Sequence, residues 1–297
     1  MRLVRQVCPR VSPHWVGDGF HVFPLFAHMA FTKAVSPFLM FDYAAPKQFE
    51  PSRRTLGVGK HPHRGFETVT IAFQGEVEHR DSLGHTSVIG KGGVQWMTAA
   101  RGIVHEEYHS KAFARTGGTF EMAQIWVNLP KKHKMDPPRY QPIDEASIPT
   151  APLRAAAADG ACEAETVGQV RVIAGAFDGV TGPAQTMTPI EMWDVKLSVP
   201  AARVRLSLPE GHNVMLLVRR GKVHLEADGR DVSEHTLAIF EQTGGAIELS
   251  GVEAHTEVLL LAGEPIDEPI AARGPFVMNT QEEIMEAITD YSNGKMG

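Results

Sequence analysis

The stretch of sequence that decides the fold begins with His61-Pro62-His63-Arg64-Gly65-Phe66-Glu67 and ends with Gly102-Ile103-Val104-His105-Glu106-Glu107. Side chains at positions i and i+2 of a β-strand leave the same face of that strand. A strand with His-x-His therefore directs two imidazoles into one space, and His105 and Glu107 repeat the spacing. We expect the two segments to face each other within a scaffold of further strands.

Three imidazoles and one carboxylate around one point would form a metal site. Nitrogen and oxygen ligands of this kind suit Fe(II), Mn(II), Ni(II), Co(II), Cu(II) or Zn(II). An ion that takes six ligands would keep two adjacent positions open, where a substrate and O2 can meet. A structural zinc site is more often closed and four-coordinate. The pattern therefore favours catalysis or ligand sensing over a purely structural metal.

Short segments of alternating residues predict the scaffold. Val69, Ile71 and Phe73 alternate with smaller or polar residues, which indicates a strand with one packed face. Glycine turns such as the one at residues 90–93 separate the segments that follow. Many short strands joined by such turns are typical of an antiparallel sandwich or barrel. In this half we expect strands at residues 38–43, 68–73, 76–80, 87–89, 94–98 and 121–129.

A second series of short strands follows a proline-rich and alanine-rich segment that we interpret as a linker. Its histidines stand singly, so the second half is expected to bind no metal. We predict an N-terminal domain over residues 1–145 with the metal site, a linker over residues 146–168, and a C-terminal domain over residues 169–297. Strands are expected at residues 170–174, 192–197, 204–208, 214–218, 223–225, 237–240, 247–249 and 258–262.

One helix is predicted at the C-terminus. Thr280-Gln-Glu-Glu283 forms a capping box, and Asn293-Gly294 is a stop signal. The apolar stripe that would dock this helix consists of Ile284, Ala287, Ile288 and Tyr291.

Composition excludes several classes of protein. The 297 residues have 43% hydrophobic and 22% charged content, as expected for a globular protein of two domains. A net charge of −6 argues against direct binding of nucleic acid, which needs a basic face. We expect no membrane span and a cytoplasmic location, because no apolar run is long enough for a span or a signal peptide. Cys8 and Cys162 are far apart and are expected to be ordinary reduced thiols.

Several ordered motifs resemble those of the pirin family of two-domain cupins. They are residues 61–68, Gly84-His85-Thr86, Gln95-Trp-Met-Thr-Ala99, Arg101-Gly-Ile-Val-His105, Gln124-Ile-Trp-Val-Asn-Leu129 and Gly274-Pro-Phe-Val-Met-Asn-Thr280. The resemblance implies an all-β bicupin of two antiparallel β-barrel domains, each a double-stranded jelly roll, with a C-terminal helix. It also implies that His61, His63, His105 and Glu107 bind the metal, that the metal is iron, and that the protein is a monomer.

The carboxylate ligand has three candidates. Glu67 stands where a common cupin pattern takes its glutamate, four residues after His63. Strand geometry places Glu107 on the face of His105 and turns Glu106 away. The pirin resemblance also favours Glu107, which leaves Glu67 a possible role in orienting an imidazole.

Further residues of the same region are candidates for the surroundings of the metal. The apolar Phe66, Trp96, Met97, Val104 and Trp126 either line a pocket for a flat ligand or pack in the core, and Gln95 and Arg101 are candidates for polar pocket groups. We expect the unpaired His79, His85 and His109 to lie at the surface or around the ligands.

The resemblance implies two functions and leaves a third open. Bacterial proteins of this kind are similar to quercetin 2,3-dioxygenases, which open the ring of a flavonol, a small flat aromatic substrate, with O2 and release carbon monoxide. In that reaction Glu107 would also be catalytic, as the acceptor of the substrate proton. Eukaryotic pirins are described as iron-containing transcription cofactors, so the alternative is a redox-sensing protein that acts through a regulatory protein partner. A third hypothesis is another metal-dependent cupin reaction, such as isomerisation or decarboxylation of a small acid.

Overall fold

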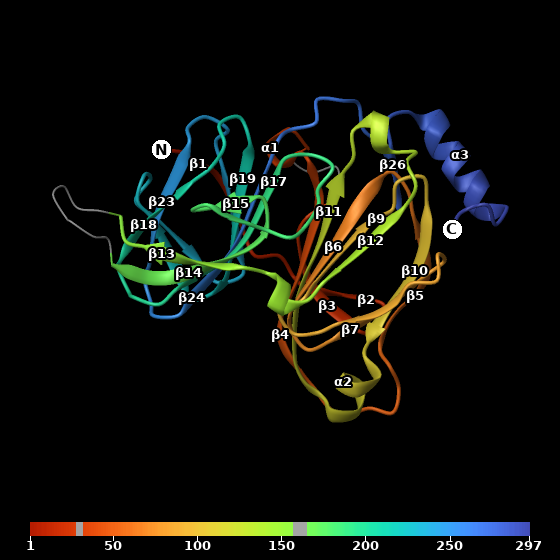
Figure 1. Ribbon diagram of the computed structural model, residues 1–297, viewed down its shortest axis with the longest axis horizontal. Coiled ribbons are helices and arrows are strands. Elements are labelled where there is room, and N and C mark those ends of the chain that lie inside the picture. Colours follow the sequence, from red (N-terminus) through yellow and green to blue (C-terminus); the bar gives the residue numbers. More distant parts are fainter. Residues whose placement is uncertain (28–31, 157–164) are drawn as a thin grey trace. The chain divides into compact units, whose positions relative to one another are not determined.

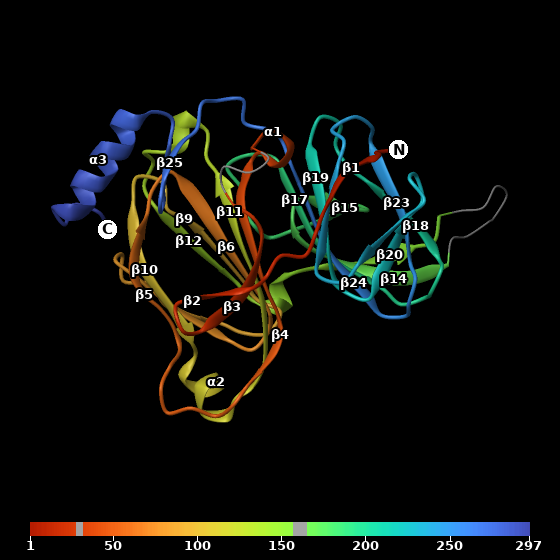
Figure 2. The same ribbon diagram turned by 180° about the vertical axis from the view of Figure 1, so that it is seen from behind.

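The computed structural model describes residues 1–27, 32–156 and 165–297, and these residues fold into two compact units. We call the first the site unit; it contains Val11–Thr32, Pro37–Glu145 and Ile266–Gly297. The second, the companion unit, contains Met1–Arg10, Lys33–Ser36 and Ala146–Pro265. Figures 1 and 2 show that strands dominate both units.

The site unit contains a seven-stranded sheet, a four-stranded sheet and a two-stranded sheet. The seven-stranded sheet has the order β12 (Arg139–Ile143), β9 (Val94–Thr98), β6 (Phe66–Gln74), β11 (Gly118–Asn128), β4 (Phe38–Phe49), β3 (Phe20–Phe26), β2 (His14–Val16). The four-stranded sheet has the order β5 (Gly57–His63), β10 (Ile103–His109), β7 (Val77–Asp81), β8 (Thr86–Ile89). The remaining elements are β25 (Ala271–Arg273), β26 (Phe276–Met278), α2 (Lys111–Thr116), α3 (Gln281–Ser292) and the 3-10 turn η1 (Lys131–His133).

The companion unit repeats this set of sheets. Its seven-stranded sheet has the order β1 (Val4–Cys8), β22 (Thr236–Phe240), β19 (Asn213–Arg220), β24 (Thr256–Gly263), β17 (Ile190–Leu197), β14 (Thr166–Ala174), β13 (Thr150–Arg154). Its four-stranded sheet has the order β18 (Arg203–Ser207), β23 (Ala246–Gly251), β20 (Lys222–Leu225), β21 (Arg230–Ser233). The remaining elements are β15 (Ala176–Phe177), β16 (Val180–Thr181), α1 (Thr32–Val35) and the 3-10 turn η2 (Glu145–Ser147).

The predicted mostly β, two-domain architecture with a C-terminal helix is confirmed. All strand pairs within the sheets are antiparallel. Among the described residues the sheets do not close into barrels, so the double-stranded jelly roll stays a prediction. β6 differs from its prediction of one packed face, because all of its residues except the last are buried and both of its faces are therefore packed.

The chain is divided differently from the predicted boundaries at 145 and 169. The N-terminal strand β1 pairs with β22 and so belongs to the companion unit. Part of the predicted linker forms β13, which pairs with β14. The C-terminal segment returns to the site unit, where α3 packs on β25 and β26 through Ile284 and Ala287. These segments join units that are distant from them in sequence order, because sheet pairing can join strands that lie far apart in the chain.

The capping box of α3 forms as predicted. The hydroxyl of Thr280 accepts a hydrogen bond from the backbone of Glu283, and the Glu283 carboxylate accepts one from the backbone of Thr280. Tyr291 departs from the predicted stripe, because it is 41% exposed. Of the two cysteines, Cys8 is buried and free, and Cys162 lies outside the described residues.

The two units differ in what fills the space between their two large sheets. In the companion unit a continuous core of Val, Leu and Ile side chains from both sheets fills it. Leu260 and Leu206, one from each sheet, are completely buried there. In the site unit the corresponding core is smaller and is centred on Phe20, Phe113 and Phe120. The site unit also contains the cavity described below.

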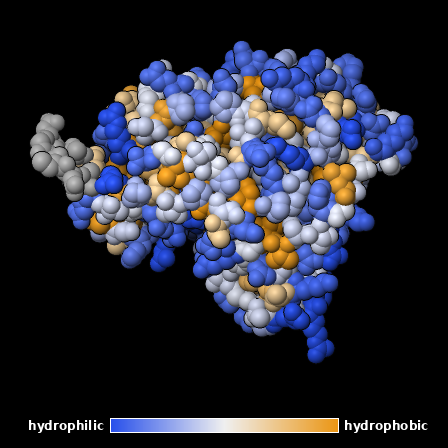
Figure 3. Space-filling model, viewed as in Figure 1, coloured by the Kyte–Doolittle hydropathy of each residue, from blue (hydrophilic) through white to orange (hydrophobic). Residues whose placement is uncertain are grey.

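The exterior of the molecule has no unusual features on the face that Figure 3 displays. Apolar side chains occur there in small groups among hydrophilic ones, as is normal for globular proteins. Within the described residues, no helix is long and apolar enough to cross a membrane.

Candidate metal centre

The four-stranded sheet of the site unit brings the predicted ligands together. Strand β10 lies between β5 and β7, and His105 pairs with His61 on β5. Residues directly opposite each other in an antiparallel pair project from the same face. Along β10 burial alternates, so that His105 and Glu107 face inward and Glu106 is partly exposed. The strand alternation that selected Glu107 over Glu106 is therefore present in the fold.

Three imidazoles converge at one end of this sheet. The ligand nitrogens of His61, His63 and His105 all lie within 4.8 Å of one another. The ring centroids of His61 and His105 are 4.3 Å apart, and those of His63 and His105 are 4.9 Å apart. Such a cluster of nitrogen donors is suited to hold one metal ion.

Burial keeps two of these imidazoles neutral. His105 is completely buried and His63 is 4% exposed. Burial holds the pKa of each well below its usual value, and the neighbouring histidines lower it further. A neutral imidazole retains a lone pair, which is the form that binds a metal.

The hydrogen bonds of the cluster test whether a metal fits. His61 Nδ1 lies 2.8 Å from the carbonyl oxygen of Gly59, so Nδ1 carries the proton and Nε2 is free to bind an ion. His63 Nδ1 and His105 Nε2 are buried, and neither has a hydrogen-bond partner among the described residues. A buried polar atom without a partner is costly, and a bound cation would remove that cost. The residues therefore fit a divalent metal ion.

The carboxylate of Glu107 stands at the edge of the imidazole cluster. Its Oε1 accepts hydrogen bonds from Thr70 Oγ1 at 3.2 Å and from Gln95 Nε2 at 3.1 Å. Together with His79 and His105 it forms a second group of donor atoms within 4.8 Å of one another. The two groups share His105, so Glu107 adjoins the three-histidine group without being part of it.

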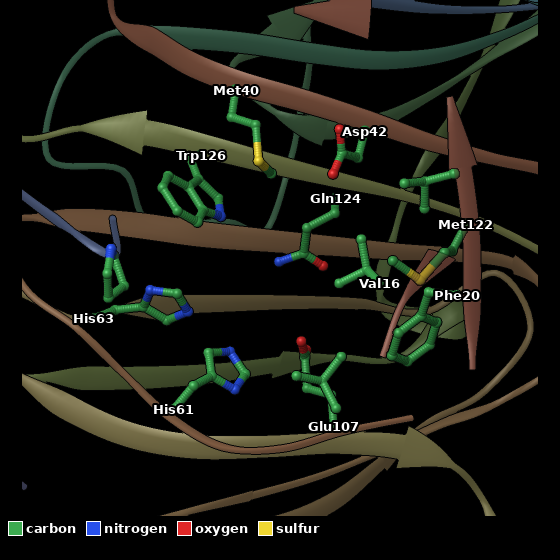
Figure 4. Close-up of a pocket in the computed structure, with 13 residues that line it drawn as sticks. Val16, Phe20, Met40, Asp42, His61, His63, Glu107, Met122, Gln124 and Trp126 are labelled. Carbon is green, nitrogen blue, oxygen red and sulfur yellow. The ribbon is translucent and has the colours of Figure 1, made fainter. Parts of the chain in front are cut away.

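A cavity of about 240 Å³ opens beside the cluster (Figure 4). Its lining is predominantly apolar and contains a few polar groups, as in sites for small ligands. The lining residues are Val16, Phe20, Val22, Met40, Asp42, Val58, His61, His63, Glu107, Met122, Gln124, Trp126 and Pro275.

Asp42 is an unexpected member of this lining. It comes from β4 and is 8% exposed, and Figure 4 shows its carboxyl group on the cavity side, near Gln124 and Met40. Burial raises the pKa of Asp42 to about 7. Asp42 lies inside a strand whose sequence pattern predicts burial, and nothing in that pattern marks it as a pocket residue. The cavity forms only where residues of two sheets meet, so a local pattern does not predict its lining.

The other predicted pocket residues divide into two sets. Trp126 lines the cavity, and its ring lies 5.3 Å from that of His63. Phe66, Trp96 and Met97 are completely buried in the core, which was the alternative reading for each. Neither they nor Val104 line the cavity.

The predicted polar residues also differ in whether they lie near the site. Gln95 contacts Glu107 as described, whereas Arg101 is exposed. Glu67 is buried and accepts a hydrogen bond from the hydroxyl of Thr98 at 2.6 Å; a role in orienting an imidazole stays a prediction. Burial raises the pKa of Glu67 to about 7, although the Thr98 hydroxyl acts in the opposite direction.

The three unpaired histidines have different surroundings. His79 is completely buried beside His105, with their Nδ1 atoms 3.4 Å apart. His109 is buried and its Nε2 lies 2.9 Å from the carbonyl oxygen of Gly19, while His85 has a 43% exposed side chain. The signal for His79 was present in the sequence as His79-x-Asp81, a third i, i+2 pair.

The C-terminal segment forms part of the site. Pro275 lines the cavity, and the backbones of Val277 and Arg64 are joined by a hydrogen bond of 3.0 Å. The Arg64 guanidinium donates to Asp290 of α3 at 3.0 Å. The loop after His63 is therefore held by residues more than 200 positions away in sequence.

The fold and the cluster define the class: a two-domain, mostly β protein of cupin type with a histidine-rich candidate metal centre in one domain. Two family models match the chain, Pirin over residues 19–127 and the Pirin C-terminal cupin domain over residues 192–297. The chain belongs to the pirin family.

Named relatives and a solved structure are similar over nearly the whole chain. A Pseudomonas aeruginosa protein provisionally named quercetin 2,3-dioxygenase PA2418 is 48% identical over 297 residues, which cover 99% of this chain and 98% of that protein. Pirin-like protein 2 of Arabidopsis thaliana is 35% identical over 89% of this chain and 77% of its own length. A crystal structure of quercetin 2,3-dioxygenase from Acinetobacter baumannii matches with a TM-score of 0.93 and 45% identity, covering 100% of this chain and 99% of that one.

Proposed function

We propose that this protein is a metal-dependent dioxygenase that opens the ring of a flavonol with O2, in the manner of a quercetin 2,3-dioxygenase. His61, His63, His105 and Glu107 hold one divalent transition metal in this proposal, with Fe(II) as the first choice. The observation that carries it is the convergence of three imidazoles with free nitrogens, at the end of an apolar cavity. The named relatives support the substrate class.

The chain supplies a binding site for a flat, aromatic molecule. Trp126, Met40 and Phe20 provide apolar surfaces for its rings. Asp42 and Gln124 provide hydrogen-bonding groups for hydroxyl substituents on the same cavity wall. The apolar lining also limits the access of water to the reacting centre.

Glu107 is the group that handles the substrate proton. Its Oε1 is held by two donors, which leaves Oε2 for the ion or for the enolic hydroxyl of the substrate. When bound, a divalent ion supplies Lewis acidity toward the enolic oxygen and a point where O2 is activated. The carboxylate then acts as general base for that hydroxyl.

The test is reconstitution followed by turnover. The metal-free protein is loaded anaerobically with Fe(II), Mn(II), Ni(II), Co(II) or Cu(II), and flavonol loss, O2 uptake and carbon monoxide release are measured. We expect metal-dependent turnover that His61→Ala abolishes and that Glu107→Gln lowers by about 100-fold or more. Glu106→Gln is the matched control, because its side chain leaves the opposite face of the same strand.

Two other outcomes would contradict the proposal, the first in the role of Glu107 and the second in the substrate class. Ring opening at wild-type rates in Glu107→Gln would remove the carboxylate from the mechanism. A full complement of metal without turnover of any flavonol would eliminate the substrate class and favour the redox-sensing role, with a protein partner in place of the substrate. A cytoplasmic location fits either reading and belongs to the same proposal.

A further inference from the structure

A cluster of polar residues lies next to His105 of the metal centre, and none of its members lines the cavity. It consists of His79 and Asp81 on β7, His85 in the following turn, and Tyr140 on β12. The rings of His79 and Tyr140 stack with centroids 4.6 Å apart and 20° between their planes. Those of His85 and Tyr140 stack at 5.2 Å and 18°. This stacking fixes the plane of the His79 ring.

Asp81 sets the direction of the hydrogen bonds in this cluster. Its Oδ1 accepts the backbone N–H groups of Leu83 at 2.9 Å and His85 at 3.0 Å. Its Oδ2 lies 3.1 Å from His79 Nε2 and 2.8 Å from His85 Nδ1. An ionised carboxylate only accepts hydrogen bonds, so His79 Nε2 must carry a proton.

The tautomer of His79 then determines that of His105. When His79 is neutral, only one of its ring nitrogens carries hydrogen, so its Nδ1 is an acceptor. It lies 3.4 Å from His105 Nδ1, which must therefore be the donor. The lone pair of His105 is left on Nε2, the buried nitrogen without a partner among the described residues.

A second chain of hydrogen bonds from the same cluster reaches Glu107. The Tyr140 hydroxyl donates to Gln95 Oε1 at 3.2 Å, and it is also in close contact with the hydroxyl of Ser87. With its oxygen occupied in this way, Gln95 presents its Nε2 to Glu107 Oε1 at 3.1 Å. The orientation of the Gln95 amide is thus fixed by the tyrosine.

We propose that Asp81, His79 and Tyr140 are positioning residues that fix the tautomer of His105 and the orientation of Glu107 before a metal arrives. The inference rests on the proposed metal site but not on the proposed reaction. A ligand held in the correct tautomer binds a metal without first exchanging a proton, so the cluster raises metal affinity.

Asp81→Asn is the critical variant, because it reverses hydrogen-bond polarity with almost no change of shape. The two backbone N–H donors at Oδ1 require the amide oxygen there, so the amide nitrogen must occupy the place of Oδ2. That nitrogen donates to His79 Nε2, moves the His79 proton to Nδ1, and forces His105 to carry its proton on Nε2. The same change at the exposed Asp178, Asp178→Asn, is the matched control.

The first measurement uses metal-free protein labelled with ¹⁵N-histidine. Long-range ¹H–¹⁵N NMR reports which ring nitrogen of each histidine carries the proton. We expect the Nδ1–H form of His105 in the wild type and in Asp178→Asn, and the Nε2–H form in Asp81→Asn. An unchanged His105 tautomer in Asp81→Asn would overturn the inference, whatever reaction the protein catalyses.

The second measurement is Co(II) affinity by competition with a chelator. We expect Asp81→Asn to bind about 10–100-fold more weakly than the wild type, with Asp178→Asn unchanged. Equal affinity of Asp81→Asn and wild type would also overturn the inference. If the wild type bound no Co(II), the proposed function would fail, and the metal-free NMR result would still decide the tautomer.

A further variant separates positioning from direct ligation and does not depend on the folding of Asp81→Asn. His79→Phe keeps an aromatic ring against Tyr140 but removes the acceptor for His105. We expect a mixed His105 tautomer and about 10-fold weaker Co(II) binding, with the three paramagnetically shifted ring N–H signals of the ligands retained. Loss of one of these signals would identify His79 as a ligand and reject its positioning role.

Discussion

Asp42 illustrates how a single buried acid connects the cavity with stability. The residue is 8% exposed, and burial raises the pKa of its carboxyl group to about 7. An acid whose pKa is raised in the folded state binds its proton more tightly there than in the unfolded chain. The free energy of unfolding therefore decreases as pH rises from about 4 toward 7.

The first prediction concerns Asp42→Asn. Its stability relative to wild type should increase between pH 5 and pH 7, by up to about 1.4 kcal/mol per pH unit, and level off above pH 7. Urea unfolding at pH 5, 6, 7 and 8 measures this difference, with Asp178→Asn as the exposed control. Parallel pH profiles for Asp42→Asn and wild type would contradict it.

At the scale of elements, the C-terminal helix is a local structure that the sequence encodes almost completely. Thr280 and Glu283 satisfy each other's backbone N–H groups, so the helix begins where the capping box predicts. Its buried residues Ile284 and Ala287 then pack against β25 and β26. The blue helix in Figure 1 belongs by these contacts to the site unit.

The second prediction concerns this cap. Thr280→Ala should lower the free energy of unfolding of the site unit by about 1 kcal/mol, because Glu283 loses the acceptor for its backbone N–H. Chemical denaturation followed by circular dichroism measures the loss. Thr289→Ala, an exposed threonine later in the same helix, is the control and should change stability by less than about 0.5 kcal/mol.

The second element that holds the site is β26, a strand near the C-terminus that Lys134 contacts. The buried ammonium group of Lys134 donates to the carbonyls of Gly65 at 2.6 Å and Val277 at 2.9 Å, and to the Asn128 side chain at 2.7 Å. Burial lowers the pKa of Lys134 to about 7, while Glu268 and Glu283 act in the opposite direction. One amine thereby connects the loop after His63 with β26.

The third prediction is that Lys134→Met destabilises the site unit by about 2–4 kcal/mol, because three buried acceptors lose their donor. Lys132→Met, two residues earlier and exposed, should be close to neutral. Hydrogen exchange locates the effect: the amides of Arg64 and Val277 should lose protection before those of the companion unit. Uniform loss of protection throughout the chain would show that Lys134 has no special role at this strand.

At the scale of the whole molecule, the two units use the same set of sheets for different purposes. Apolar side chains fill the space between the sheets of the companion unit, whereas the site unit keeps a cavity and a cluster of imidazoles there. The expected absence of metal from the C-terminal domain stays a prediction, as does the monomeric state, which sedimentation velocity measures directly.

The fourth prediction follows from binding linkage. A metal that binds only the folded site unit should stabilise it by about 2.7 kcal/mol when free metal is 100 times the dissociation constant. Calorimetry with and without Co(II) should therefore show a higher Tm for the wild type and no change for His61→Ala. An equal rise of Tm in both proteins would place the bound metal elsewhere.

The sequence by itself determined the local features of this protein. Alternation along β10 selected the face shared by His105 and Glu107, and the capping box determined the start of α3. Both depend on the few residues nearest in the chain, whose geometry is fixed by the repeat of a strand or helix. The family resemblance followed from the same local motifs, and the Pirin models confirm it.

Only the tertiary structure decided which distant segments meet. It assigned the N-terminal strand to one unit and the C-terminal helix to the other, against the order of the sequence. It placed His79 against His105 and Asp42 on the cavity wall, where burial raises the pKa of the Asp42 carboxyl group. The physical reason is that pairing register and burial depend on strands far apart in the chain, and no local pattern specifies those partners.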